Sequence, residues 1–106
     1  YPEPVEAATA YLYSRLDGNV TMSELAGVVG VSEAHLNRLF RTALQTSPIR
    51  YFINQKLAWA AHLLRHTSLS IKEVAFRTGY SDPLYFSSQF KKHYGASPKR
   101  YRAKES

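Results

Sequence analysis

The sequence predicts an all-α fold: two helix-turn-helix subdomains joined by a long linker helix, about seven helices in homeodomain-like units. Two observations predict it. The segment from Val20 to Tyr51 recurs, with one extra residue, from Leu69 to Tyr101, and no stretch has the alternating pattern of a strand. A repeat that matches at capping and turn residues indicates two copies of one supersecondary unit. The matching residues are Glu24, Ala26, Gly30, Phe40, Ser47, Pro48, Arg50 and Tyr51 in the first copy and Glu73, Ala75, Gly79, Phe90, Ser97, Pro98, Arg100 and Tyr101 in the second.

Helix starts and turns can be placed in each copy. Thr21 to Glu24 and Ser70 to Glu73 both match the capping box, in which a hydroxyl and a carboxylate satisfy the free amides of a new helix. Gly30 and Gly79 follow, where the chain must reverse through a left-handed backbone that glycine adopts without steric cost. The expected helices span residues 4–16, 22–29, 33–43, 48–66, 71–78, 83–94 and 99–102, with residues 103–106 frayed.

Composition limits the protein class. A chain of 106 residues with 44% hydrophobic content buries enough apolar surface for one domain or two small lobes. Its apolar runs are too short for a membrane span, and it contains no cysteine. No nucleophile elbow, phosphate loop or paired-carboxylate arrangement supports an enzyme. We therefore expect neither catalysis nor a cofactor.

The charge distribution points to a polyanion as the partner. The formal net charge is +6 and the pI about 9.7. Most acidic residues lie near the N-terminus or at helix starts. Residues 34–72 and 83–104 therefore contain basic residues but no acidic ones. The basic residues in those stretches are Arg38, Arg41, Arg50, Lys56, Arg65 and Lys72 in the first and Lys91, Lys92, Lys99, Arg100, Arg102 and Lys104 in the second.

The helix expected at 33–43 has two different faces. Leu36, Leu39, Phe40 and Ala43 recur at spacings of three and four and predict the buried face. For an isolated amphipathic helix, the other face would be interpreted as an ordinary solvent-exposed surface. The capped helix and the glycine turn before it favour instead a face that contacts bases in the major groove of DNA. Arginine can pair with guanine, asparagine with adenine, and an alanine methyl can touch thymine. The expected base-reading residues are Ala34, Asn37, Arg38 and Arg41, with Thr42 and Gln45 near phosphate.

The helix expected at 83–94 repeats this geometry. Phe86, Phe90 and part of His93 are expected inside. The other face has less hydrogen-bonding reach, so we expect the first unit to carry more of the sequence readout. Its expected base-reading residues are Leu84, Ser87 and Ser88, and its expected phosphate contacts are Lys91, Lys92, Lys99 and Arg100.

The predicted organisation is an N-terminal subdomain at 1–47, a linker helix at 48–66 and a C-terminal subdomain at 67–106. A linker of 19 residues spans about 28 Å, which suits two insertions about one DNA turn apart. Because the two reading faces differ, the DNA site should be asymmetric.

With these motifs in place, the chain resembles the DNA-binding domain of the AraC/XylS family of bacterial transcription regulators. The residues from Ser70 to Arg102 are the most similar to the family signature, notably Gly79-Tyr80, Tyr85-Phe86, Phe90-Lys91-Lys92 and Ser97-Pro98. Gln45 departs from the glycine that is usual there, Lys56 from a frequent arginine, and Ser88 from a longer residue.

The resemblance implies a cytoplasmic, nucleoid-associated regulator, most often an activator that contacts RNA polymerase. It also implies that one copy engages a half-site, that the isolated domain is a monomer, and that the base-reading positions named above touch DNA. We interpret the chain as a C-terminal fragment whose effector or dimerisation domain lies outside it, because nothing here holds an effector pocket.

Other interpretations remain at this point. His62 and His66 are four apart but lack a third metal ligand nearby, so no metal site is expected. Tyr80, Tyr85, Tyr94 and Tyr101 could stack on single-stranded bases, although their repeat positions favour packing. The main alternative function is a basic helical module that binds an acidic protein or an anionic membrane surface, which would call for one continuous basic stripe.

Overall fold

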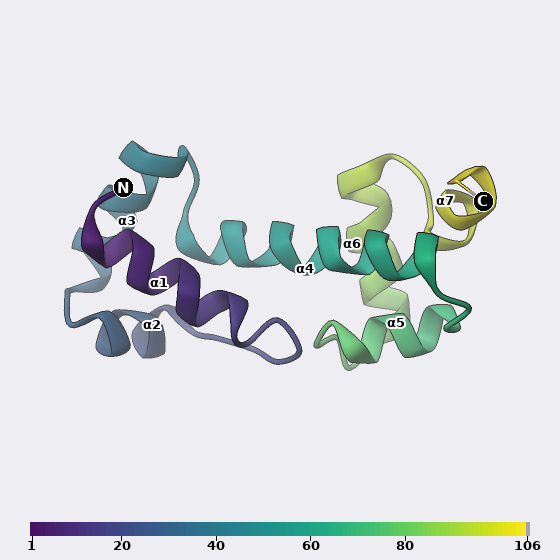
Figure 1. The fold of residues 1–106 in the computed structure, drawn as a ribbon, viewed down its shortest axis with the longest axis horizontal. Helices are drawn as coiled ribbons and strands as arrows, with labels where there is room; N and C mark the ends of the chain where they lie inside the picture. Colours follow the sequence, from purple (N-terminus) through teal and green to yellow (C-terminus); the bar gives the residue numbers. More distant parts are fainter. Residues whose placement is uncertain (106) are drawn as a thin grey trace. The chain divides into compact units, whose positions relative to one another are not determined.

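The computed structural model describes residues 1–105, which form seven helices and no strand (Figure 1). The predicted all-α class and the helix-turn-helix pairs are confirmed. Two compact units divide within the long fourth helix, one from Tyr1 to Gln55 and the other from Lys56 onward. The helices are α1 (Glu3–Tyr13), α2 (Met22–Val29), α3 (Glu33–Leu44), α4 (Pro48–His66), α5 (Ile71–Arg77), α6 (Pro83–Tyr94) and α7 (Pro98–Glu105).

The first unit packs α1, α2 and α3 around one apolar core together with the first turns of α4. Its most buried side chains come from all of these helices, so none of them can bury its apolar face without the others. Ala26, one of the residues that recur in the repeat, is buried in this core. The fully or nearly fully buried residues are Val5, Ala8, Leu12, Leu25, Leu36, Phe40 and Phe52.

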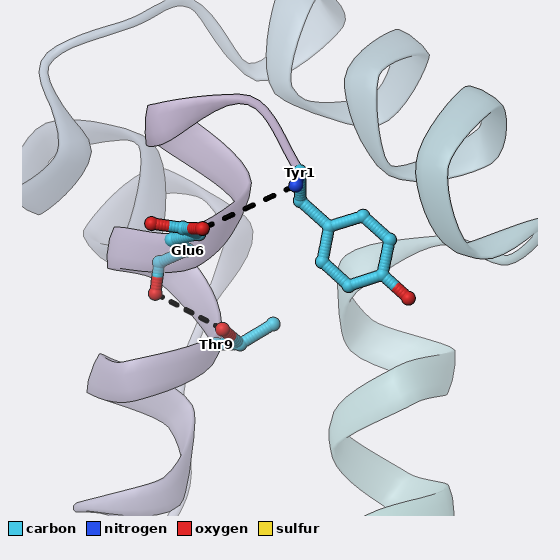
Figure 2. Close-up of polar contacts among 3 residues, drawn as sticks. All are labelled: Tyr1, Glu6 and Thr9. Carbon is cyan, nitrogen blue, oxygen red and sulfur yellow. Dashed lines mark hydrogen bonds and ion pairs between the residues drawn. The ribbon is translucent and has the colours of Figure 1, made fainter.

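Helix α1 is shorter than the predicted 4–16. The helix begins at Glu3. In its first turns the Tyr1 ammonium lies 4.0 Å from the Glu6 carboxylate, and the Thr9 hydroxyl donates to the Glu6 carbonyl at 3.0 Å (Figure 2). It ends at Tyr13 because the Ser14 hydroxyl donates to the Tyr11 carbonyl at 2.6 Å. A side-chain bond of this kind competes with the helical backbone ladder and closes the last turn early.

Tyrosine contacts hold α1 against the start of α4. The Tyr13 hydroxyl lies 3.0 Å from the Tyr51 hydroxyl, and it also donates to Gln55 Oε1 at 3.2 Å. Burial, and then the hydrogen bond with Tyr13, raises the pKa of Tyr51 to about 12. This polar cluster complements the apolar packing of Phe40 beside Tyr51, whose ring centroids are 5.9 Å apart.

The start of α2 corrects one sequence prediction. The Thr21 hydroxyl accepts from the Glu24 backbone N–H at 3.1 Å, as a capping box requires. However, the Glu24 carboxylate accepts from the Tyr11 hydroxyl on α1. The first copy is therefore a single-sided cap, and the carboxylate ties α2 to α1. Gly30 then ends the helix with φ of 84°, the left-handed turn that was predicted.

The second unit builds the complete form of the same cap. The Ser70 hydroxyl accepts from the Glu73 N–H at 3.0 Å, and the Ser70 N–H donates to Glu73 Oε1 at 2.9 Å. The Ser70 N–H thereby lowers the pKa of the Glu73 carboxyl. Helix α5 ends at Arg77, one residue earlier than predicted, since the Thr78 hydroxyl donates to the Val74 carbonyl at 2.9 Å.

Aromatic rings dominate the interior of the second unit. Phe86 and Phe90 are fully buried, with ring centroids 5.8 Å apart, and Phe90 also contacts Tyr94 at 4.6 Å and Tyr101 at 5.2 Å. On helix α4, Ile53 is only partly buried. The buried apolar residues that α4 contributes to this unit are Leu57, Ala60, Ala61, Leu63 and Leu64.

The C-terminal segment was expected to fray after Arg102, and this expectation is wrong for residues 103–105. Helix α7 continues to Glu105, while Ser106 lies outside the described residues. The Arg102 Nε donates to the Leu64 carbonyl at 3.0 Å, and Arg65 donates to the Tyr101 hydroxyl at 2.6 Å. These bonds fix the middle of α7 against α4.

Helices α3 and α6 end in the same left-handed turn, although the residues at the turn differ. Gln45 closes α3 with φ of 61° and Gly95 closes α6 with φ of 80°. Gln45 is the only non-glycine residue with positive φ among the residues described. A left-handed backbone costs roughly 1–2 kcal/mol for a residue with a Cβ, so the first unit tolerates a strain that the second avoids.

Exchanging these residue types should change stability in opposite directions. We expect Gln45→Gly to raise the free energy of unfolding by about 0.5–1 kcal/mol and Gly95→Ala to lower it by about 1 kcal/mol. A Cβ at Gly95 would meet nothing within 4 Å, so backbone conformation is the only cost. Urea denaturation followed by circular dichroism measures both, and destabilisation by Gln45→Gly would contradict the argument.

Candidate nucleic-acid interface

Helix α3 has the two faces that the sequence predicts. Leu36 and Phe40 are fully buried, and Leu39 and Ala43 pack partly buried against the same core. This packing fixes the rotation of the helix about its axis, so the opposite face is left to solvent. On that face Ala34, Arg38, Arg41, Thr42 and Gln45 are exposed, while Asn37 is half-buried.

The residues before α3 determine where it begins. Gly30 donates to the Ala26 carbonyl at 2.8 Å, and the Val31 N–H reaches the same oxygen at 3.2 Å. Ser32 then caps α3 by accepting from the His35 N–H at 3.1 Å. The glycine turn and the serine cap thus set α3 at a defined angle to α2, which is the supersecondary geometry of a helix-turn-helix.

Helix α6 is placed by equivalent bonds. Tyr80 donates to the Ala75 carbonyl at 2.9 Å, and the Asp82 carboxylate accepts from the Leu84 N–H at 3.0 Å. Pro83 occupies the first turn, where a missing N–H has no cost. Phe86 and Phe90 face inward, but His93, which was expected to be partly buried, is exposed. Tyr94 takes the position against Phe90 in its place.

The outer face of α6 is less polar than that of α3. Leu84 is 82% exposed, the most exposed large apolar residue of the unit, and Tyr85 beside it is 57% exposed. Ser88, Lys91 and Lys92 are exposed as well, and Ser87 is half-buried. The expectation that the repeated tyrosines pack inside is therefore wrong for Tyr85, although Tyr80, Tyr94 and Tyr101 do pack against Phe86 or Phe90.

The cations of these two faces carry unbalanced charge. Within the part of the chain that the structure describes, Arg38, Arg41, Lys91 and Lys92 form no ion pair with a carboxylate. Lys99, Arg100 and Lys104 on α7 are likewise exposed and without an acidic partner there. Lys104 was outside the predicted helix. Its spacing of four residues from Arg100 was the signal that the two share a helical face.

Lys56 does not belong to this basic surface, contrary to the sequence analysis. Its side chain is only 4% exposed, and Nζ donates to the Thr78 carbonyl at 2.9 Å. Thr78 is fully buried at the end of α5, immediately before the Gly79 turn. A buried carbonyl needs a donor, so Lys56 secures the turn that positions α6 and leaves polyanion binding to other cations.

Replacement of Lys56 should therefore affect stability and leave charge-dependent binding unchanged. We expect Lys56→Met to lower the free energy of unfolding by about 1–3 kcal/mol, because the Thr78 carbonyl loses its donor. The dependence of DNA affinity on salt should keep the native slope. Denaturation measures stability, and binding at several salt concentrations measures the slope of log affinity against log salt. A variant with native stability and a slope lowered by one unit would show that Lys56 contacts DNA.

The two histidines on α4 lie together without further ligands. The rings of His62 and His66 are 4.5 Å apart. Among the described residues, no group of three or more His, Cys, Asp or Glu side chains could hold a metal ion. Nor does any helix there have the length and apolar character needed to cross a bilayer.

The fold and the site define a class: a pair of helix-turn-helix units, each with one polar and basic helix face left open. Comparison with known proteins agrees. A family model described as a helix-turn-helix domain matches residues 25–104. The lactose operon transcription activator of Staphylococcus xylosus is 33% identical over 100 residues, which cover 94% of this chain and 36% of that protein. The chain thus spans about a third of that relative.

Two solved structures of DNA-binding domains share this fold, and each matches this chain over at least 90% of both lengths. A transcriptional regulator from Chromobacterium violaceum, described by its AraC-type DNA-binding domain, superposes with a TM-score of 0.90 at 30% identity, covering 97% of this chain and 92% of its own. The DNA-binding domain of the global transcriptional factor AdpA, solved with a target DNA, has a TM-score of 0.88 at 29% identity, covering 94% and 90%. The chain belongs to the AraC-type helix-turn-helix family.

Proposed function

We propose that this chain binds duplex DNA sequence-specifically, as the DNA-binding domain of a bacterial transcription regulator, with α3 and α6 each entering a major groove. The observation that carries the proposal is the construction of the two units. In each, a capped helix and a left-handed glycine lead into a helix with a buried apolar face and an exposed face that carries cations. The likeness to a domain solved on its target DNA supports it.

The α3 face has the chemistry for reading base edges. Arg38 and Arg41 can each donate two hydrogen bonds to guanine, and Asn37 can pair with adenine. The exposed methyl of Ala34 suits contact with the methyl of thymine. At the end of the helix, the exposed Thr42 and Gln45 are placed to donate to backbone phosphate.

The α6 face has fewer donors and more apolar surface, so the two units read different bases. Leu84 offers apolar contact, and Ser87 and Ser88 have short hydroxyls that bond either a base or a phosphate. Phosphate contacts are proposed for Lys91, Lys92, Lys99 and Arg100, all exposed. The preferred site should therefore be asymmetric, with most of its sequence information in the part contacted by α3.

The wider role extends the same proposal. One copy would place the subdomains 1–47 and 67–106, joined by the linker 48–66, in adjacent grooves of one duplex. The isolated chain would act as a monomer in the bacterial cytoplasm. The whole protein would contact RNA polymerase and act as an activator. The name of the Staphylococcus xylosus relative supports the activator role.

Selection of bound fragments from random duplex DNA tests the function directly. The expected result is one recovered, non-palindromic motif that the chain binds about 10³-fold or more tightly than random duplex. Binding to vesicles with anionic headgroups is measured in parallel. Tight vesicle binding together with no preference among duplexes would contradict the proposal and favour a basic membrane-surface module.

Arg38→Ala should separate reading from general attraction. We expect a loss of about 1–3 kcal/mol on the selected site and a relaxed preference at one base pair. Affinity for random duplex should fall much less. Arg15→Ala is the matched control, because Arg15 is an exposed arginine of the same unit that lies over the Tyr11 ring. Equal losses on selected and random DNA for Arg38→Ala would refute its reading role.

Lys92→Ala should show the opposite signature. An exposed lysine that touches phosphate contributes equally to every sequence, so affinity for selected and random duplex should fall by the same factor. The slope of log affinity against log salt should decrease by about one unit. Titrations at several salt concentrations give this slope, and a changed base preference would show that Lys92 touches a base edge.

A further inference from the structure

A basic hollow lies within the second unit, where the end of α6 meets one face of α7. Its volume is about 640 Å³. Three of its lining residues are cations, namely Lys91, Arg100 and Lys104, and the others are small. The small lining residues are Gly95, Ala96, Ser97 and Ala103.

The described residues place no carboxylate against the cations of the hollow. No acid occurs between Pro83 and Lys104 in the sequence. Within the described part of the chain, the three lining cations also form no ion pair. Like charges that line one hollow repel one another, and an anion bound among them would relieve that repulsion. The hollow is therefore suited to a group with concentrated negative charge.

The position of the hollow relates it to the reading face of α6. Lys91 belongs both to the hollow and to the exposed stripe formed with Leu84, Ser87 and Ser88. Along the helix, Lys91 lies about 4–5 Å beyond Ser88 at 1.5 Å per residue. The major groove is roughly 12 Å wide, so a helix that touches bases near its middle brings its next turn to the bordering phosphates.

The first unit does not repeat this arrangement of residues. Two of the cations have counterparts there, Arg41 for Lys91 and Arg50 for Arg100. The small Gly95 and Ala103 correspond to the larger Gln45 and Ile53, and the third cation corresponds to the neutral Asn54. The small residues and the third cation are therefore particular to the second copy of the repeat.

We propose that the basic hollow binds one backbone phosphate of the DNA, at the edge of the groove that α6 enters. This inference rests on the proposed function and assigns to α7 a part in it that includes Lys104. Binding sites for small molecules are mostly apolar and enclosed, whereas all three cations here are exposed. A backbone phosphate is part of a DNA duplex that α6 already holds, so an open site is sufficient to bind it.

Single-phosphate neutralisation in the selected duplex tests this contact. Each phosphate is replaced in turn by an uncharged methylphosphonate, and affinity is measured for the chain and for the double variant Arg100→Gln, Lys104→Gln. For the unaltered chain, one linkage or two adjacent linkages beside the bases read by α6 should lose roughly tenfold or more. The double variant should bind the unmodified duplex more weakly by a similar factor and lose much less than the unaltered chain at that linkage, because Lys91 alone remains in the hollow.

The salt dependence gives a second, independent readout. The double variant should lower the slope of log affinity against log salt by about one unit, as expected for one phosphate. The control variant Arg15→Gln removes an exposed cation outside the hollow and should keep the slope. Circular dichroism checks that both variants retain the helical content of the unaltered chain.

The possible outcomes separate this inference from the function itself. An unaltered chain without preference for any duplex would overturn both. If the preference is present but the double variant keeps the native slope and the native sensitivity at every linkage, only the inference fails. Titration with inorganic phosphate alone completes the test. Saturable shifts of the Gly95 to Ser97 amides without coupling to any DNA linkage would identify a site for a free anion and overturn the DNA contact.

Discussion

The structure depends on the burial of one face of two short helices. Leu36 and Phe40 hold α3 in the first unit, and Phe86 and Phe90 hold α6 in the second, all without exposure to solvent. Each fully buried side chain of this size contributes about 1.5–3 kcal/mol, which is far more than any one exposed contact. Once these faces are fixed, the helical period leaves no choice about which residues meet solvent. The candidate interface is thus a consequence of core packing.

The two units keep one scaffold and differ on their surfaces. Caps and left-handed turns recur at matching positions, and even Gln45 adopts the backbone that Gly95 adopts in the second unit. The exposed faces diverge: α3 presents arginines and an amide, whereas α6 presents Leu84 and two serines. The second unit also has the hollow that Lys104 lines. The two units therefore share their packing and differ in the chemistry of their exposed faces.

The helices and their buried and exposed faces could be predicted because capping residues and apolar periodicity act locally. The errors arose where tertiary contacts decide. Lys56 was counted as surface charge because its acceptor, the Thr78 carbonyl, is 22 residues away. Glu24 matched a capping box, but Tyr11 on another helix binds its carboxylate. The extension of α7 depends on bonds from Arg102 to α4. Side-chain identity alone does not reveal partners that only the fold brings together.

The central claim is that the exposed faces of α3 and α6 are the surfaces that meet DNA. Nuclear magnetic resonance of the isotopically labelled chain, titrated with its selected duplex, tests it most directly. We expect the largest chemical-shift changes on residues 34–45 and 84–95 and on the start of α7, with small changes along α1. Large changes confined to α1 and α4, with α3 and α6 unaffected, would contradict this claim.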